Sequence, residues 1–172
     1  KRNRKKFLPP RIEEYFLLRA ERFGEADMGE RIPELQTLRV KKVAVVGLGN
    51  LGAPSAIEFA KAGVGELRII DYDFVEGGTT VRWPFGLSAV GLRKVDCIKD
   101  FIAKNFPYTI VVPEIHRIGS TEQRADGRTE LEIINNFFAG IDLVFDATAE
   151  YGIQHFLADL CQANGIPYVC IS

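Results

Sequence analysis

Short apolar runs alternate with amphipathic stretches along the chain from residue 43 onward. The first run, residues 43–46, is continuously apolar, which is typical of a parallel strand covered by helices on both faces. The same reasoning predicts further strands at residues 67–71, 109–112, 143–147 and 168–171. Amphipathic spacing predicts helices at residues 51–62, 92–105, 131–138 and 153–164. This alternation predicts an α/β protein with a doubly wound, mostly parallel sheet and helices on both faces.

The segment before the first strand has a different pattern. After Pro9 and Pro10, apolar side chains recur at helical spacing, and Gly24 is placed to end the helix; these residues are Ile12, Tyr15, Phe16, Ala20 and Phe23. We therefore expect an N-terminal helical extension. We divide the chain into a basic arm with this helical segment, residues 1–40, and an α/β domain, residues 41–172. We expect the domain to be incomplete at its C-terminus, because the last predicted strand ends with the chain.

Composition and charge exclude several classes of function. The 172 residues are 47% hydrophobic, yet no stretch reaches the roughly 18 apolar residues of a membrane span, which excludes an integral membrane protein. Five of the first six residues are basic, which leaves a net charge of −6 on residues 7–172. We therefore expect no general binding to nucleic acid.

The cysteines and histidines carry no recognisable chemistry. Cys97, Cys161 and Cys170 lie far apart without a CxxC pair, so we expect core residues in a cytoplasmic protein. His116 and His155 have no metal-ligand spacing, and we assign them no role.

A glycine-rich loop follows the first predicted strand directly. Its sequence is GLGNLG, from Gly47 through Asn50 to Gly52, and an amphipathic stretch comes after it. Gly47 allows the tight turn, Gly49 lets phosphate oxygens approach the backbone, and Gly52 permits close packing of helix on strand. Free N–H groups at the helix start then bind the anion. The loop predicts a nucleotide site in a Rossmann-like fold.

Two acidic residues follow the second predicted strand. Asp71 lies nineteen residues beyond Gly52, at the end of the strand, where a carboxylate accepts hydrogen bonds from ribose hydroxyls. Asp73 is either a second acid of the same site or a turn residue. These features alone suit an NAD-dependent oxidoreductase equally well, although we find no proton donor that hydride transfer would need.

The segments that follow resemble one family. DYDFVE, Arg82 in TTVRWPF, and GLRK ending in Lys94 resemble the adenylation domain shared by ubiquitin-activating enzymes and the bacterial ThiF, MoeB and HesA proteins. AGVGELRIIDYD upstream and LVFDATAEYGIQHFLADLCQANGIPYV downstream are also similar to that family. The resemblance extends from about Leu38 to Ser172 and identifies residues 41–172 as an ATP-binding adenylation domain.

This resemblance implies a reaction and assigns residues to it. ATP binds with Mg²⁺, and the C-terminal carboxylate of a ubiquitin-like or sulfur-carrier protein attacks the α-phosphate, which releases pyrophosphate. By position, Asp71 matches the ribose acid, Asp73 the second acid, and Asp146 the magnesium-associated aspartate. Arg82 and Lys94 match the phosphate-binding cations. We expect these last two and Asp146 to act in catalysis, and we expect the following residues to bind the nucleotide: Gly47, Gly49, Asn50, Gly52, Asp71, Asp73, Thr79, Arg82 and Lys94.

The chemistry agrees with these residue types. A carboxylate nucleophile is already ionised at neutral pH, so the reaction requires no general base. It requires cations that bring two anions together and offset the charge of the leaving pyrophosphate, a role that Arg82 and Lys94 can fill. Asp146 can hold Mg²⁺ directly or through water.

Several positions depart from the family pattern, among them Gly78, Thr80 and Ala89. Thr79 stands where the family usually has Asn, and Trp83 follows Arg82 where it usually has Gln. Ala149 and Glu150 replace the usual Asp-Asn pair. These departures keep open a second possibility, a ThiF-like binding module without catalysis.

The resemblance also implies a homodimer in which an N-terminal Arg of one subunit reaches the other subunit's ATP. Arg19 and Arg22 are the candidates, although both also fit the exposed side of an amphipathic helix.

Overall fold

The computed structural model describes residues 16–21, 24, 27, 32–120 and 126–171. In this part of the chain, five parallel strands form one sheet in the order β3-β2-β1-β4-β5. The strands are β1 (Lys42–Val46), β2 (Glu66–Ile70), β3 (Ile110–Glu114), β4 (Leu143–Asp146) and β5 (Tyr168–Cys170). The helices between them are α1 (Gly52–Lys61), α2 (Lys94–Asn105), α3 (Glu130–Phe138) and α4 (Tyr151–Asn164). The α/β fold predicted from the sequence is confirmed, with element ends that shift by one or two residues.

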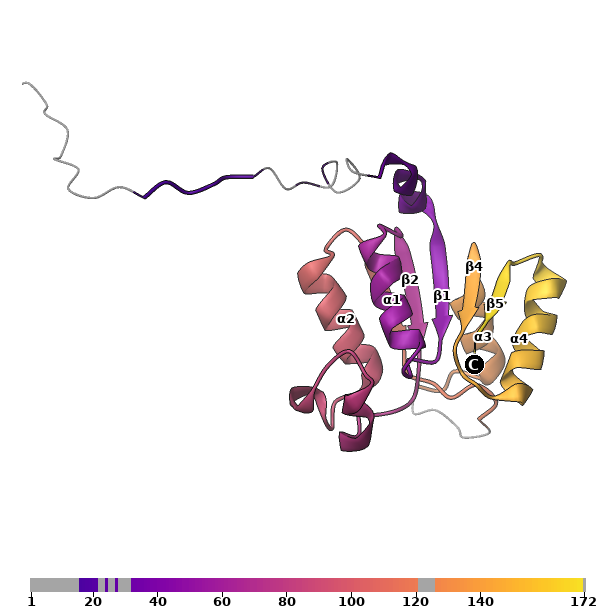
Figure 1. The fold of residues 1–172 in the computed structure, drawn as a ribbon. Coiled ribbons are helices and arrows are strands. Elements are labelled where there is room, and N and C mark those ends of the chain that lie inside the picture. The colour runs from indigo at the N-terminus through magenta and orange to yellow at the C-terminus, as the bar shows by residue number, and fades with distance from the viewer. Residues whose placement is uncertain (1–15, 22–23, 25–26, 28–31, 121–125, 172) are drawn as a thin grey trace, which may run out of the picture.

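Helices cover both faces of the sheet (Figure 1). Side chains of α1 and α2 pack in one core with Val43 and Val45, while those of α3 and α4 pack in a second core with Ala44 and Val46. Successive side chains of a strand point to opposite faces, so β1 contributes to both cores in turn. This explains why its sequence is continuously apolar, and it confirms the helices on both faces.

The order of the strands places a crevice beside β1. This strand pairs with β2 on one side and with β4 on the other. The sheet is therefore extended from β1 first in one direction, by β2 and β3, and then in the other, by β4 and β5. In such sheets the crevice lies outside the carboxyl ends of the strands at this switch point, and ligands bind there. The loop that follows β1 is the glycine-rich loop.

An ordered segment joins β2 to α2. It contains two short 3₁₀ helices, η3 (Gly77–Val81) and η4 (Leu87–Ala89), and a bridge between Phe74 and Arg93 closes it. Val75, Trp83 and Ala89 from this segment are buried in the core that contains α1 and α2. The segment is therefore packed against the domain beside the crevice.

The N-terminal region differs from its prediction. A 3₁₀ helix, η2 (Pro33–Val40), leads into β1, but residues 16–21 form no helix, so the expectation of a helix was wrong for them. The rest of the predicted helix lies outside the described residues. The side chains of Phe16, Leu17 and Leu18 are 82–94% exposed, so no core covers this apolar segment. Isolated helices shorter than about 12–15 residues are marginal in water, which explains the difference.

One cysteine is also placed differently. Cys161 is buried and Cys97 is half-buried on their helices, but Cys170 is exposed, so its assignment to the core was wrong. The reason is that β5 lies at the edge of the described sheet. None of the helices in the described ranges combines the length and apolar character needed to cross a bilayer.

Candidate functional site

The glycine-rich loop turns tightly between β1 and α1. Gly47 has φ of +82°, a conformation that L side chains rarely adopt. A Cβ on Gly52 would lie 1.8 Å from the carbonyl oxygen of Gly47, so only glycine fits there. At Gly49, by contrast, no protein atom lies within 4 Å of the position of a Cβ. The loop is thus tightly packed between Gly47 and Gly52, whereas at Gly49 there is space for a ligand to approach the backbone.

The start of α1 has free backbone donors. No side chain caps this helix, and the N–H groups of residues 49–52 have no hydrogen-bond partner in the described part of the chain. Unpaired N–H groups at a helix start carry partial positive charge and bind anions. The loop therefore fits a phosphate group.

Asp71, at the end of β2, is hydrogen-bonded to the glycine loop. Its carboxylate is 7% exposed and accepts hydrogen bonds from the backbone N–H groups of Leu48, at 2.6 Å, and of Asp73, at 2.7 Å. Asp71 thus lies beside the loop, as the spacing predicted, and also holds it in place. Asp71 also lines a pocket in the crevice, together with Gly47 and Gly49.

Lys94 is the first residue of α2 and is only 7% exposed. Its Nζ lies 2.7 Å from Oδ2 of Asp73 and 4.0 Å from Oδ2 of Asp71. All three side chains line the same pocket as Gly47 and Gly49. The structure thereby brings together five of the predicted site residues, which come from the ends of β1 and β2 and from the start of α2.

Arg82 lies outside that pocket but is joined to the glycine loop. With the Asn50 amide oriented so that its oxygen faces Arg82, that oxygen lies 3.3 Å from both Nε and Nη2 of Arg82 and can accept hydrogen bonds from them. The Arg82 side chain is exposed at the end of η3. Thr79, in η3, donates its hydroxyl to the carbonyl of Glu76 at 2.7 Å and does not line the pocket. Asn50 and Arg82 therefore form a second, more exposed part of the site.

Trp83 covers the glycine loop from outside. Its indole Nε1 donates a 2.8 Å hydrogen bond to the carbonyl of Leu48, and the ring packs edge-on against Phe85. The side chain is 5% exposed. From the sequence, Trp83 was recognised only as a departure from the family pattern; its contact with a residue 35 positions away gave no local signal.

Asp146, at the end of β4, is fully buried. Its Oδ1 accepts hydrogen bonds from the N–H group and the hydroxyl of Thr148, and its Oδ2 accepts one of 2.7 Å from the hydroxyl of Tyr168. Burial and this hydrogen bond raise the pKa of Tyr168 well above its ordinary value, so Tyr168 remains a donor. Thr148 lines the pocket and Asp146 does not. Asp146 is therefore joined to the pocket wall through Thr148 but does not itself line the pocket.

The backbone beside Asp146 is strained. Ala149 has φ of +56°, in the left-handed region that costs alanine more than glycine or asparagine. Glu150 follows it, is exposed, and lines the pocket. Among the described residues, no group of three His, Cys, Asp or Glu side chains is arranged to hold a metal ion. A divalent ion would therefore need phosphate oxygens of a ligand as well.

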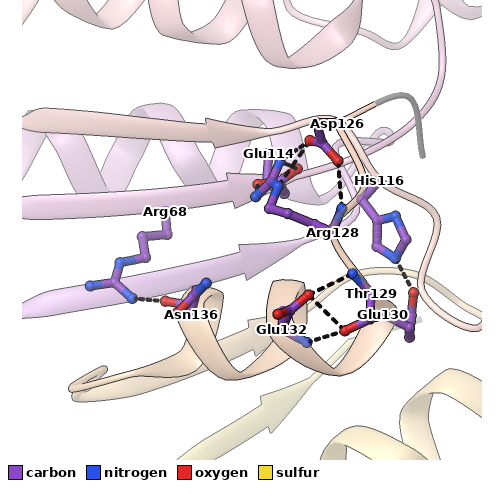
Figure 2. A network of polar contacts seen from close by, with 9 residues as sticks. All are labelled: Arg68, Glu114, His116, Asp126, Arg128, Thr129, Glu130, Glu132 and Asn136. Carbon is purple, nitrogen blue, oxygen red and sulfur yellow. Dashed lines mark hydrogen bonds and ion pairs between the residues drawn. The ribbon is translucent and has the colours of Figure 1, made fainter. Parts of the chain in front are cut away.

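His116 also lines the pocket, although the sequence gave no reason to assign it a role. Its side chain is 5% exposed, and its Nε2 contacts the carboxylate of Glu130 at the start of α3 (Figure 2). Ile70, Ile118 and Ile153 also line the pocket and form its apolar part. Their packing with α3 and α4 places this apolar part on the opposite face of the sheet from Trp83.

Fold and site together define a Rossmann-like α/β domain with a glycine loop at the switch point of its sheet. The chain belongs to the ThiF family, which matches residues 18–172. The family resemblance found in the sequence is thereby confirmed.

Individual relatives give the range of similarity. The chain is 41% identical over 150 residues to the uncharacterized protein y4qC of Sinorhizobium fredii, covering 87% of this chain and 26% of that protein. It is 32% identical over 137 residues to the adenylyltransferase and sulfurtransferase UBA4 of Yarrowia lipolytica, covering 78% of this chain and 31% of that protein. It thus spans about a quarter to a third of these relatives.

A solved structure supports the same fold. The tRNA N6-threonylcarbamoyladenosine dehydratase TcdA of E. coli, in complex with ATP, matches with a TM-score of 0.71 and 25% sequence identity. The match covers 84% of this chain and 57% of the TcdA chain.

Proposed function

We propose that this domain binds ATP in the crevice and adenylates the C-terminal carboxylate of a ubiquitin-like or sulfur-carrier protein, with release of pyrophosphate. The observation that carries the proposal is the buried Lys94, held between Asp71 and Asp73 at the mouth of the glycine loop. Hydride transfer to NAD leaves this cation unexplained, whereas phosphoryl chemistry uses cations to offset charge on the phosphates. UBA4 and TcdA support ATP as the nucleotide, because one is an adenylyltransferase and the other was solved with ATP.

The charges in the pocket support a requirement for Mg²⁺. Lys94 faces two carboxylates, so Asp71, Asp73 and Lys94 together carry one net negative charge where a polyphosphate would bind. Arg82 supplies one more cation from the rim. A divalent ion held by the phosphates and one carboxylate would offset the remaining charge. We keep Asp146 as the magnesium-associated residue, and its burial favours a role through water over direct ligation.

In the proposed reaction, the residues of the pocket and its rim have different roles. The N–H groups of the glycine loop bind phosphate oxygens, and the carboxylate of Asp71 accepts hydrogen bonds from the ribose. Lys94 and Arg82 stabilise the charge that moves onto pyrophosphate as the carboxylate of the carrier protein attacks the α-phosphate. The attacking carboxylate is ionised, so no side chain needs to remove a proton.

Two observations favour a second candidate, a ThiF-like binding module without catalysis. Both oxygens of Asp146 are occupied by Thr148 and Tyr168, and Ala149 and Glu150 stand where the family has Asp and Asn. Such a module would bind ATP or a carrier protein without forming an adenylate.

We further propose a homodimer. Arg19, one of the two arginines proposed to reach the partner's nucleotide, is exposed and forms an ion pair with Glu21 at 2.5 Å, so its guanidinium is accessible. Arg22 lies outside the described residues.

Calorimetric titration with ATP plus Mg²⁺ and, separately, with NAD tests the nucleotide. We expect the protein to prefer ATP, and we expect Arg82→Ala to weaken the binding of ATP. Arg93→Ala is the matched control, because Arg93 stacks on Phe74 outside the pocket. A preference for NAD would overturn the proposal in favour of an oxidoreductase.

Pyrophosphate exchange by the complete protein with Mg²⁺ and a carrier protein tests catalysis. Exchange that is lost in Asp146→Ala supports the adenylation reaction. Binding of ATP without exchange would instead support the non-catalytic module.

A further inference from the structure

Trp83 has no role in the proposed reaction, yet it contacts the glycine loop directly. Its side chain is 5% exposed and does not line the pocket in the crevice. The indole Nε1 donates a buried hydrogen bond of 2.8 Å to the carbonyl of Leu48, which stands between the first two glycines of the loop. Through this bond Trp83 can influence a ligand that it does not touch.

The peptide groups on both sides of Leu48 are held by hydrogen bonds. The N–H group of Leu48 donates to Oδ2 of Asp71 at 2.6 Å, and its carbonyl accepts from Trp83. The peptide bond between Leu48 and Gly49 is trans. In a planar trans peptide, the carbonyl and the following N–H group point in opposite directions. The hydrogen bond from Trp83 therefore turns the N–H group of Gly49 away from the indole.

The N–H group of Gly49 is available for a ligand. It has no hydrogen-bond partner in the described part of the chain, whereas the carbonyl of Gly49 accepts from the N–H group of Ala53. Gly49 lines the pocket, and apart from its chain neighbours no protein atom lies within 4 Å of the position of a Cβ. A free backbone N–H group at the start of a helix suits an anion. Its direction decides how well it meets a phosphate oxygen.

The indole of Trp83 is itself held in place. Its ring packs edge-on against Phe85, with ring centroids 5.2 Å apart, and Phe85 packs against Phe101 of α2 at 5.0 Å. The backbone N–H group of Trp83 donates to the carbonyl of Thr79 in η3 at 3.0 Å. These contacts fix the indole N–H before a ligand arrives, so binding of a ligand does not have to order it.

We propose that Trp83 is a positioning residue that directs the N–H group of Gly49 at a phosphate of the nucleotide. The proposal rests on the proposed function, because it requires a phosphate at the glycine loop. Without the indole N–H, the carbonyl of Leu48 would be buried without a partner, and the peptide would no longer be held in one direction. The N–H group of Gly49 would lose its direction with it.

Titration of the complete protein with Mg·ATP and with adenosine, each in competition with a fluorescent ATP analogue, tests the proposal. Adenosine has the base and the ribose but no phosphate, so the N–H group of Gly49 contributes only to the binding of ATP. We expect Trp83→Phe, which keeps an aromatic ring but removes the donor, to lower the affinity for ATP on the order of tenfold. Its affinity for adenosine should be unchanged. Trp83→Gln returns an N–H donor without the ring and should recover part of the affinity for ATP.

Phe85→Leu is the matched control, because it loosens the packing of the indole but keeps the indole N–H. We expect this variant to melt at a lower temperature and to keep the wild-type ratio of the ATP affinity to the adenosine affinity. Replacement of Trp83 by benzothienylalanine, in which sulfur takes the place of the indole N–H, removes the donor with less change in shape. It provides the same test if Trp83→Phe does not fold.

A folded variant without the indole N–H that keeps the wild-type ratio would overturn the proposal. An equal loss of affinity for ATP and adenosine would overturn it too, because that result marks a role in packing alone. In both cases the wild type still binds ATP and the proposed function stands. A wild type that binds ATP no more tightly than adenosine would overturn the phosphate site of the proposed function, and this proposal with it.

Discussion

The two sides of the crevice are built differently. At the ends of β1 and β2, Asp71 accepts a hydrogen bond from the glycine loop and forms an ion pair with Lys94. Both side chains still line the pocket. At the end of β4, Asp146 is sealed behind Thr148 and Tyr168, and the backbone at Ala149 is strained. The comparison teaches that one side of a crevice can keep its polar groups at the pocket surface while the other side buries them.

The largest effect on activity is expected at Lys94. Lys94→Ala removes the buried cation and leaves the carboxylates of Asp71 and Asp73 close together, so we expect pyrophosphate exchange to fall on the order of 10²–10³-fold. Lys99→Ala, on the exposed side of the same helix, is the control and should keep its activity. Equal activity of the two variants would show that Lys94 is not needed for the reaction.

Gly52→Ala should have the largest effect on stability. The added Cβ would lie 1.8 Å from the carbonyl oxygen of Gly47, so the loop and α1 must separate. We expect the free energy of unfolding to fall by about 3 kcal/mol or more, measured by urea denaturation. Gly152→Ala in α4 is the control, because a Cβ there meets no atom within 4 Å. A loss of stability no larger than that of the control would mean that the loop is not closely packed.

Ala149→Asn tests the strain on the other side of the crevice. Asparagine tolerates the left-handed conformation that Ala149 adopts at φ of +56°, so we expect the variant to gain about 0.5–1 kcal/mol of stability. Ala163→Asn, at an exposed position inside α4, should instead lose stability. If Ala149→Asn is also destabilising in a thermal melt, the strain at the end of β4 is not a feature of the folded protein.

The smallest effect is expected at Asp142, just before β4 and far from the crevice. Hydrogen bonds from Lys41 and from the backbone of Lys42 lower the pKa of Asp142 below its ordinary value of 3.8. A lowered pKa stabilises the fold above that value, and the contribution is lost as the pH falls through the folded-state pKa. We expect Asp142→Asn to cost less than about 1 kcal/mol at pH 7, because the pair is exposed.

The measurement is urea denaturation of the wild type and of Asp142→Asn across a pH series. The difference between them should shrink as the pH falls below 3.8. A difference that grows toward low pH would contradict the expected sign. Nucleotide binding should be unchanged in this variant, because Asp142 lies at the opposite end of β4 from the crevice.

The sequence predicted those features that depend on local patterns. The strands and helices from residue 42 onward follow from apolar periodicity, and the glycine loop and Asp71 follow from spacing within one strand-helix-strand unit. The N-terminal helix failed in residues 16–21 because periodicity does not reveal whether a surface exists to cover the apolar side.

Other features depend on contacts between distant residues. The indole of Trp83 donates a hydrogen bond to the carbonyl of Leu48, 35 residues earlier. The imidazole of His116 contacts the carboxylate of Glu130, and no periodic pattern in the residues between them predicts this contact. The exposure of Cys170 depends on β5 lying at the edge of the described sheet, which strand order determines and sequence pattern does not. The burial of Asp146 likewise depends on Tyr168, from a strand that is later in the chain.

The ion pair between Lys94 and Asp73 has a consequence for turnover. In the proposed reaction, a phosphate group that binds Lys94 would compete with Asp73 for its ammonium group, so part of the binding free energy would be used to weaken that pair. When pyrophosphate leaves in that reaction, the same carboxylate would return to Lys94, which would lower the barrier to product release. An Asp73→Asn variant would then hold its nucleotide longer, because the competing carboxylate would be gone.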